Sequence, residues 1–398
     1  MTLETPAHLE PCMLEAYPSP LADLLAELVR ESALLGQRLH PATASSLAEL
    51  VLVMNCYYSN LIEGHDTRPR DIERALAQDF DADSLRRDLQ LEARAHIRLQ
   101  REVDSLCAEG RYGEPASEER IRWLHREFYA DAPARMLRLE GTSGTFDMIP
   151  GEYRSEPRHD VMVGRHQPPS SAQVAGFMAY FERRYRMAPL GASARIVAFA
   201  AAHHRLNYIH PFCDGNGRVS RLMSHAMAHS AGIAAHGLWS ISRGLARGLR
   251  DAGEYKRMMD ATDAPRRGDL DGRGNLSLGA LTEFVTWFCE VSLDQIRFMG
   301  SMFDLAALEG RLRDYVHGTL GLPPEAWGLC AEALRRGELP RGEAARITGK
   351  SERTARAWLS RLHDAGLLTS DSHRAPARLR FGVSSADVLF PRLFPAQV

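Results

Sequence analysis

The feature that most constrains the fold is a twelve-residue run at 210–221, HPFCDGNGRVSR, which joins two segments of helical character. The segment before it, 193–206, is small and apolar throughout, as in a buried helix. Within the run, Gly215 and Gly217 flank Asn216. Glycine adopts positive φ without steric cost, so this turn can aim several backbone amides at one anion where the second helix begins. The run therefore predicts two helices joined by a phosphate-binding loop.

The other polar residues of the run suit the chemistry of a polyphosphate. Asp214 is a hard oxygen ligand, and Mg²⁺ is usually held by one or two carboxylates together with the phosphates of its substrate. Arg218 and Arg221 are three residues apart, so on a helix they share a face and can each fork onto phosphate oxygens. Asn216 adds a side-chain donor, and His210 is the one side chain of the run that accepts a proton near neutral pH. We expect a triphosphate site with a general base.

At these residues the chain resembles the Fic family, whose signature HPFx[D/E]GNGRxxR is matched at every fixed position. The resemblance implies a protein adenylyltransferase that uses ATP and Mg²⁺ to transfer AMP to a Ser, Thr or Tyr hydroxyl of a target protein. It implies that His210 deprotonates the hydroxyl and that Asp214 holds the Mg²⁺ between the α- and β-phosphates. Residues 215–217 would bind phosphate, and Arg218 and Arg221 would hold the β- and γ-phosphates.

A second motif, SNLIEG at 59–64, is similar to the inhibitory pattern [S/T]xxxE[G/N] of the same family. Ser59 and Glu63 are four residues apart and share a helix face. The resemblance implies that Glu63 pairs with Arg221, which would then be unable to grip the γ-phosphate. Two alternatives stay open. Glu63 could simply end an amphipathic helix capped by Gly64, or it could position a water for the reverse reaction, removal of AMP.

A third segment, 150–169, precedes the helix-rich core and opens with PGEYR. Its β-prone piece at 160–163 is bounded by glycine and prolines, which predicts a small hairpin. Fic proteins carry a flap in a similar position, and the edge strand of such a flap would align a target segment by β-augmentation.

The basic residues of the chain are concentrated near its end. Residues 335–382 contain eleven Lys and Arg against five Asp and Glu, a net charge of +6. The segment predicts a short helix, a turn at Gly349, a second helix over 351–364 and a strand within 372–381. This spacing resembles a winged helix-turn-helix. The buried face of the second helix is predicted to consist of Ala355, Trp358, Leu359 and Leu362, with Arg353, Arg356 and Arg361 pointing outward.

Binding of DNA through residues 335–382 is therefore the alternative function. A basic recognition helix favours it. Against it, winged helices also serve as protein-docking or dimer surfaces, and Glu352 at the start of the helix would repel phosphate. The sequence leaves open whether the chain forms a homo-oligomer.

Composition sets the remaining bounds. The 398 residues are 44 % hydrophobic and carry a net charge of −2, which is typical of a globular protein without a general attraction to nucleic acid or membrane. Six cysteines lie far apart with no C-x-x-C pair, so we expect free thiols. Cys213, inside the signature, is expected to have no chemical role. No signal peptide or membrane span is recognised, and we expect a cytoplasmic location.

The predicted fold is all-α, a Fic helical core with a small β-hairpin flap followed by a winged helix domain. We expect an N-terminal helical region with the inhibitory helix at 1–110, a catalytic core at 111–300 and a linker helix with the winged helix at 301–398. His203 and His204 are expected to be buried histidines without a metal, since no third ligand is evident. Tyr255 is expected in the core. Helices are predicted at 20–39, 45–62, 70–77, 82–108, 117–130, 172–186, 193–206, 218–229, 239–261 and 276–296.

Overall fold

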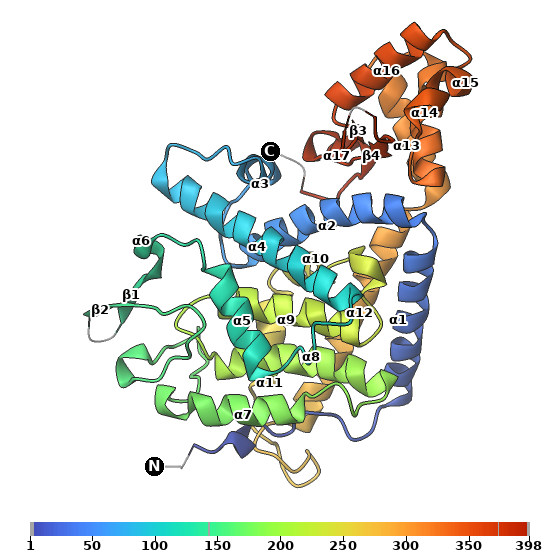
Figure 1. Ribbon diagram of the computed structural model, residues 1–398. Coiled ribbons are helices and arrows are strands. Elements are labelled where there is room, and N and C mark those ends of the chain that lie inside the picture. Colours follow the sequence, from blue (N-terminus) through green and yellow to red (C-terminus); the bar gives the residue numbers. More distant parts are fainter. Residues whose placement is uncertain (1–3, 142–143, 373, 396–398) are drawn as a thin grey trace. The chain divides into compact units, whose positions relative to one another are not determined.

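The computed structural model describes residues 4–141, 144–372 and 374–395, and it is almost entirely helical (Figure 1). Its chain divides into two compact units. The first unit consists of the described residues within 1–30, 55–234 and 240–295, and the second of those within 31–54, 235–239 and 296–398. The expectation of a helical protein with one small hairpin is confirmed. Among the described helices, none is both long enough and apolar enough to cross a bilayer.

Three long helices contribute to both units: α1 (Ser19–Gln37), α2 (Pro41–Ile62) and α12 (Leu278–Met302). The other helices of the first unit are α3 (Pro69–Leu76), α4 (Ser84–Ala108), α5 (Glu118–Phe128), α6 (Ala134–Leu137), α7 (Val174–Arg184), α8 (Ala192–Ile209), α9 (Asn216–Ser230), α10 (Ile241–Arg247) and α11 (Glu254–Thr262).

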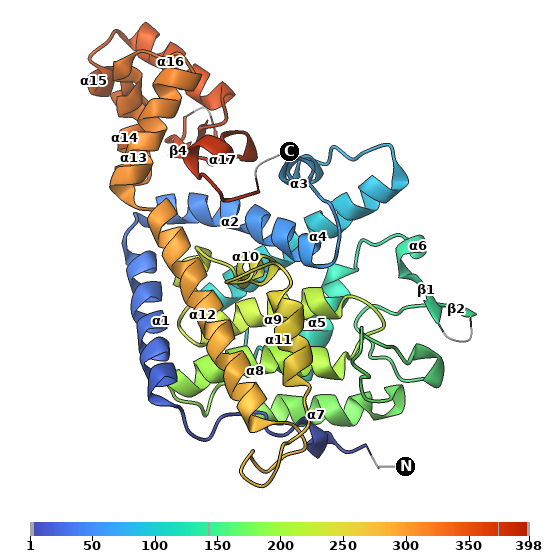
Figure 2. The same cartoon turned by 180° about the vertical axis from the view of Figure 1, so that it is seen from behind.

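The centre of the first unit is the pair α8 and α9, which pack against each other (Figures 1 and 2). Helix α8 is buried along nearly its whole length, as its small and apolar sequence predicts. Helices α4 and α5 pack on α9, while α7 packs on α8. The loop that joins α8 to α9 is therefore held between two helices that are themselves enclosed.

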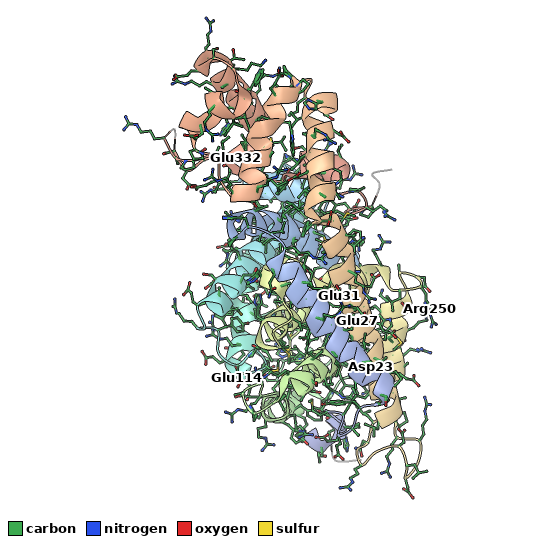
Figure 3. The ribbon with its side chains drawn as sticks, turned by 90° about the vertical axis from the view of Figure 1, so that its right-hand side faces the viewer. Asp23, Glu27, Glu31, Glu114, Arg250 and Glu332 are labelled. Atoms are coloured by element: carbon green, nitrogen blue, oxygen red, sulfur yellow. The ribbon has the colours of Figure 1, made fainter. Side chains whose placement is uncertain are left out.

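Helix α1 shows how the amphipathic pattern is satisfied. Leu21, Leu25 and Leu28 are buried on one face. Asp23 and Glu27, four residues apart, belong to a row of acidic side chains along another face of the helix (Figure 3). The spacing of three and four between apolar residues thus gives a helix with one packed stripe.

The hairpin lies earlier in the chain than the sequence predicts. Strands β1 (Arg138–Gly141) and β2 (Gly144–Asp147) pair antiparallel, whereas the predicted segment 150–169 contains a single bridge between Val163 and His166. Proline lacks the N–H that a sheet requires, and 150–169 carries four prolines. Instead, the segment contains a short 3₁₀ turn, Pro157–His159, and a second 3₁₀ turn, Ser171–Gln173, follows it.

A second correction concerns 239–261, where one continuous helix is predicted. Two helices, α10 and α11, are found, separated by residues 248–253. Gly248 has φ +65°, and a Cβ at this position would lie 2.2 Å from the carbonyl oxygen of Asp251. Glu254 accepts hydrogen bonds from the backbone N–H groups of Leu249 and Arg250 at 2.6 and 3.2 Å, so its carboxylate stabilises the break.

The second unit contains α13 (Leu305–Asp314), α14 (Trp327–Arg336), α15 (Ala344–Thr348), α16 (Glu352–Asp364), strands β3 (Leu368–Thr369) and β4 (Arg378–Leu379), and α17 (Val383–Leu389). Gly349, with φ +66°, makes the turn between α15 and α16. The Ser351 hydroxyl accepts a hydrogen bond from the Thr354 N–H and caps α16. Of the predicted buried face of α16, three residues are buried and Trp358 is half-buried.

Candidate active site

The signature loop begins with a residue in a strained conformation. Helix α8 ends at Ile209, and His210 follows in the left-handed region with φ +50° and ψ +63°. This conformation costs a non-glycine residue roughly 1–2 kcal/mol. Pro211 comes next and cannot continue the helix. The turn therefore fixes the place of the imidazole at the C-terminal end of α8.

Arg154 holds this turn in place. Its guanidinium is buried and donates to the carbonyl oxygens of His210 (2.7 Å), Ile209 (3.0 Å) and Pro169, and to the Ser171 hydroxyl. The last carbonyls of a helix have no partner within the helix and carry a partial negative charge. Arg154 satisfies two carbonyls at this end of α8 and thereby offsets the strain at His210.

The far end of the loop depends on Gly215. It is the N-cap of α9 with φ +76°, as the sequence predicts for a glycine turn. A Cβ there would also lie 2.9 Å from the Tyr129 hydroxyl oxygen, so glycine is needed for space as well as for conformation. Gly217, in contrast, has an ordinary helical φ, and the side chain that lies against it is Glu63.

The Asn216 side chain is engaged within the loop itself. Its Oδ1 accepts from the Phe212 N–H at 2.9 Å, and its Nδ2 donates to the Phe212 carbonyl at 2.8 Å. The amide therefore closes the loop on itself. Phe212 is fully buried and stacks on His125 with ring centroids 3.9 Å apart. In this state the Asn216 side chain stabilises the shape of the loop.

Asp214 keeps a partly exposed carboxylate at the mouth of the loop. Its Oδ2 accepts from the Tyr129 hydroxyl at 2.7 Å and from the Arg218 guanidinium at 3.0 Å, and 44 % of the side chain is exposed. Burial would raise the pKa of Asp214, but Arg218, Tyr129 and the Gly215 N–H lower it below its usual value. The carboxylate is therefore ionised at neutral pH and able to receive a cation.

The two arginines of the signature are both buried and both paired with carboxylates from distant parts of the chain. Arg218 lies 2.8 Å from a Glu92 oxygen of α4, in addition to its contact with Asp214. Arg221 donates from Nε to the Ser59 hydroxyl at 2.9 Å and from Nη2 to the Glu63 carboxylate at 2.5 Å. Ser59 and Glu63, which the sequence places on one helix face, thus contact the same guanidinium.

The carboxylate of Glu63 also lies against the first turn of α9. A Cβ on Gly217 would be 2.4 Å from the Glu63 Oε1, so glycine is required for this approach. Burial would raise the pKa of Glu63, but Arg221 and Arg218 lower it, and the group is ionised. Gly64 follows with φ +83°, as a C-terminal cap of α2 should. A negative charge therefore occupies the helix start at which an anion would bind.

His210 is neutral in this environment. Burial lowers its pKa to about 4, with the nearby positive charges of Arg154 and His166 acting in the same direction. A neutral imidazole can accept a proton throughout the physiological pH range. The predicted base is thus found in the protonation state that general base catalysis requires.

The other residues weighed from the sequence belong to the core. His203 is buried between the Ser224 hydroxyl (2.9 Å) and the Tyr255 hydroxyl (2.8 Å). His204 contacts the Met259 carbonyl at 3.1 Å. All six cysteines, including Cys213, are free thiols.

Sequence reasoning missed four residues that shape the site: Tyr129, Glu92, His125 and Arg154. His125 lies on α5 and Tyr129 directly follows its end. His125 accepts from the Gly151 N–H at 2.8 Å, and its Nε2 lies 3.2 Å from the Asp214 carbonyl. Nothing in the local sequence marks these side chains, because their partners are 26 to 89 residues away. Arg154 belongs to the PGEYR segment, which resembles the opening of a Fic flap. The resemblance points to a flap and gives no sign that Arg154 supports the signature loop.

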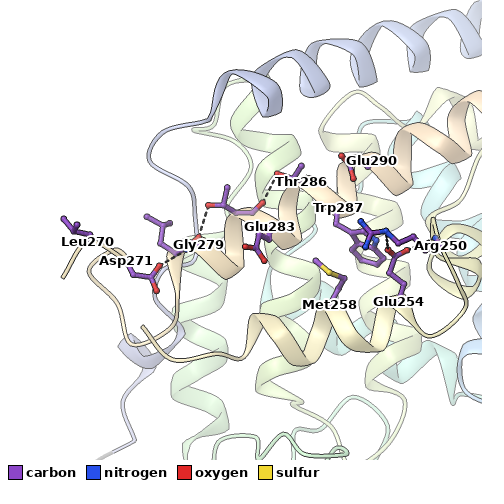
Figure 4. A pocket seen from close by; sticks show the side chains of 12 residues that line it. Arg250, Glu254, Met258, Leu270, Asp271, Gly279, Glu283, Thr286, Trp287 and Glu290 are labelled. Carbon is purple, nitrogen blue, oxygen red and sulfur yellow. Dashed lines mark hydrogen bonds and ion pairs between the residues drawn. The ribbon is translucent and has the colours of Figure 1, made fainter. Parts of the chain in front are cut away.

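A separate pocket of about 680 Å³ lies between α11, α12 and the loop before α12 (Figure 4). Its lining includes Trp287 and Met258 together with the carboxylates of Asp271, Glu283 and Glu290. None of the signature residues lines it. Because like charges repel, this acidic pocket is unsuited to a triphosphate.

Comparison with known proteins agrees with the signature. Residues 115–228 match the model of the Fic/DOC family. A segment of 83 residues is 43 % identical to "Protein adenylyltransferase Fic" of Drosophila ananassae, and one of 82 residues is 40 % identical to the protein of the same name from Drosophila erecta. Each match covers 21 % of this chain and 16 % of the relative's length.

Solved structures resemble the chain over a longer stretch. A Fic family protein from Desulfovibrio desulfuricans aligns over 92 % of this chain and 97 % of its own, with a TM-score of 0.53 and 16 % identity. Fic-1 from C. elegans aligns over 72 % of this chain and 74 % of its own, with a TM-score of 0.52 and 15 % identity. At such identities the likeness concerns the fold. The family match itself concerns residues 115–228, which have the sequence features of a Fic/DOC domain.

Proposed function

We propose that this protein transfers AMP from ATP to a hydroxyl group of a target protein, and that Glu63 inhibits the reaction. The observation that carries the proposal is the first turn of α9, where two buried arginines and the start of a helix converge and a carboxylate lies at the position suited to phosphate. The Drosophila relatives, which are named protein adenylyltransferases, support the direction of the reaction.

In this proposal the loop residues position the reactants. Nδ1 of His210 is buried, so Nε2 is the atom that would take the proton of the attacking hydroxyl. Arg154 fixes the orientation of that imidazole through the backbone. Arg218 and Arg221 would neutralise the phosphate tail, which favours departure of pyrophosphate as the hydroxyl oxygen attacks the α-phosphorus in line.

A magnesium ion suits this donor set. One ionised and partly exposed carboxylate, Asp214, stands at the loop, and Mg²⁺ commonly takes one or two carboxylates plus substrate phosphates. When bound, the ion would supply charge neutralisation of the polyphosphate. Tyr129 and Arg218 would hold the carboxylate in place for it.

Glu63 would act by competition for Arg221. The guanidinium is almost completely buried, and its Nε and Nη2 atoms are engaged by Ser59 and Glu63. A γ-phosphate could not bind there until the carboxylate withdrew. Because Glu63 lies just beyond the end of α2, a small movement at that end would be enough. This favours an inhibitory role over the alternative in which Glu63 only ends the helix.

We also propose that residues 335–382 form a winged helix. Within this range, helices α15 and α16 are followed by the β3–β4 pair, and Leu339 bridges Ala377 beside it, while α14 precedes them. This arrangement of helices and short strands supports the resemblance seen in the sequence. DNA binding by this region is a second candidate function, favoured by the exposed Arg353 and Arg356 on α16.

The test is transfer of label from ATP carrying it on either the α- or the γ-phosphate, with Mg²⁺ and the wild-type chain, Glu63→Gly, and Glu63→Gly combined with His210→Ala. We expect α-label on protein from Glu63→Gly, little from the wild type and none from the double variant. Transfer of γ-label would indicate phosphate transfer instead. Removal of AMP from a modified target, without net addition, would indicate the reverse reaction.

A further inference from the structure

A cluster outside the signature brings together two histidines and an aspartate. His225 and His229, four residues apart on α9, direct their Nε2 atoms at the same Oδ1 of Asp104 on α4, at 2.6 and 2.8 Å. The ligand atoms of the three residues all lie within 4.8 Å of one another. His225 is 7 % exposed, His229 17 % and Asp104 27 %, so the cluster is sheltered but reachable from solvent.

This set of donors has the chemistry of a metal site. Imidazole nitrogens at i and i+4 of one helix, together with a carboxylate from a second element, are ligands typical of Zn²⁺ and of related divalent transition metals. Donor atoms bonded to one zinc ion at about 2.0–2.2 Å lie roughly 3–3.6 Å apart. The Asp104 oxygen now lies closer than this to both nitrogens, so it would have to move back from them to admit the ion. Three protein ligands would leave one coordination position for water.

The position of the cluster gives it a structural consequence. Helix α4 also carries Glu92, and α9 also carries Arg218, its ion-pair partner at 2.8 Å. Helices α4 and α9 pack on each other within the first unit. An ion bonded to Asp104, His225 and His229 would link the same two helices about two to three turns further along them than that ion pair.

We propose that Asp104, His225 and His229 form a binding site for a zinc-class divalent metal that clamps α4 to α9. The site is independent of the nucleotide site and of Asp214. An ordinary Asp–His ion pair is the competing explanation, and it differs in one respect: it needs hydrogens on the Nε2 atoms, whereas a metal needs their lone pairs.

Untagged full-length protein, stripped with chelator and dialysed, is titrated with Zn²⁺ by calorimetry, and Co²⁺ is added separately to record its absorption spectrum. We expect one equivalent of Zn²⁺, ligand-field bands of low-coordinate Co²⁺, and a rise in Tm of several degrees with saturating Zn²⁺. Asp104→Asn and His229→Ala should weaken binding by more than the roughly 10–100-fold that loss of a supporting partner costs.

The matched control is His363→Ala on α16, which removes a histidine that lies 3.8 Å from a single aspartate, Asp364. It should bind Zn²⁺ as the wild type does. Absence of binding at sub-millimolar free Zn²⁺, or equal binding by the Asp104→Asn and His229→Ala variants, would overturn the proposal, as would equal occupancy by Mg²⁺. Since His229 is the more exposed histidine, its variant should fold even if one at His225 does not.

Discussion

Helix α9 carries two arginines and α16 carries three, and the two helices use them in different ways. On α9, Arg218 and Arg221 are buried and pair with carboxylates 126 and 158 residues away in the sequence. On α16, Arg356 is 77 % exposed and pairs with Glu352 of its own helix, one turn earlier. Buried arginines held by distant carboxylates mark a site built by the fold, whereas an exposed pair within one helix mainly supports the helix and its solubility.

The difference also predicts how each region responds to change. An exposed i,i+4 ion pair contributes about 0.3–0.5 kcal/mol. A buried charge that loses its partner costs about 1–3 kcal/mol or more. Substitutions near α9 should therefore change stability and activity together, while those on the exposed face of α16 should change neither by much.

The largest effect is expected at His210. In a Glu63→Gly background, His210→Ala should lower AMP transfer by about 100- to 10,000-fold, because the hydroxyl then lacks its general base. Single-turnover transfer of α-label is the measurement, with ATP binding by calorimetry as the control for an intact site. Retained transfer by a folded variant would exclude the base assignment.

Arg154 should come next. Arg154→Met leaves the carbonyls of Ile209 and His210 without this donor, so the imidazole should shift and kcat should fall by about 100-fold, with KM for ATP nearly unchanged. The matched control is Arg158→Met in the same loop, where Arg158 is half-exposed and pairs with Glu156. A fall in KM and kcat together, or an equal effect in the control, would contradict a positioning role.

Glu63 and Glu352 provide the direct test of the comparison. Glu63→Gln should tighten ATP binding by about tenfold or more, since a charge-assisted bond to Arg221 is lost, and should lower the free energy of unfolding by about 1–3 kcal/mol. Glu352→Gln should leave ATP binding unchanged and stability within about 0.5 kcal/mol. Calorimetry and urea unfolding give both quantities. Equal responses at the two sites would remove the distinction between them.

The pH dependence should be small within the neutral range. Since burial lowers the pKa of His210 to about 4, the base form persists as the pH falls and is lost only near that value. We expect kcat/KM of the Glu63→Gly variant to show no inflection near pH 6.5 between pH 8 and pH 5. A tenfold decline per pH unit below 6.5 would show an ordinary, solvated histidine.

The smallest effect is expected from α16. Replacing Arg353 and Arg356 by glutamine should not alter AMP transfer. If this region binds DNA, each arginine that contacts a phosphate should reduce the slope of log affinity against log salt by about one when it is removed. Fluorescence anisotropy over a salt series would distinguish a nucleic-acid surface from a solvated face.

Local chemistry was well predicted from the sequence. The left-handed Gly215 and the Gly64 cap follow from the strong conformational preference of glycine, whereas α8 extends to Ile209, three residues beyond its predicted end. The contribution of Tyr129, Glu92 and Arg154 could not be foreseen, because each acts on residues that only folding brings near. The hairpin was predicted too late in the chain, and the break at Gly248 was not predicted, for a related reason: weak periodic patterns cannot show which backbone groups find partners.

Gly217 has only a hydrogen atom where other residues have a side chain, and this leaves space beside the first turn of α9. The space above it accommodates the Glu63 carboxylate and, in the proposed active state, would accommodate a phosphate oxygen. A methyl group at this position would lie 2.4 Å from the Glu63 Oε1, so the carboxylate would have to move away from the first turn of α9. An alanine here would thus disturb repression directly, and it would also fill part of the space that the proposed phosphate needs.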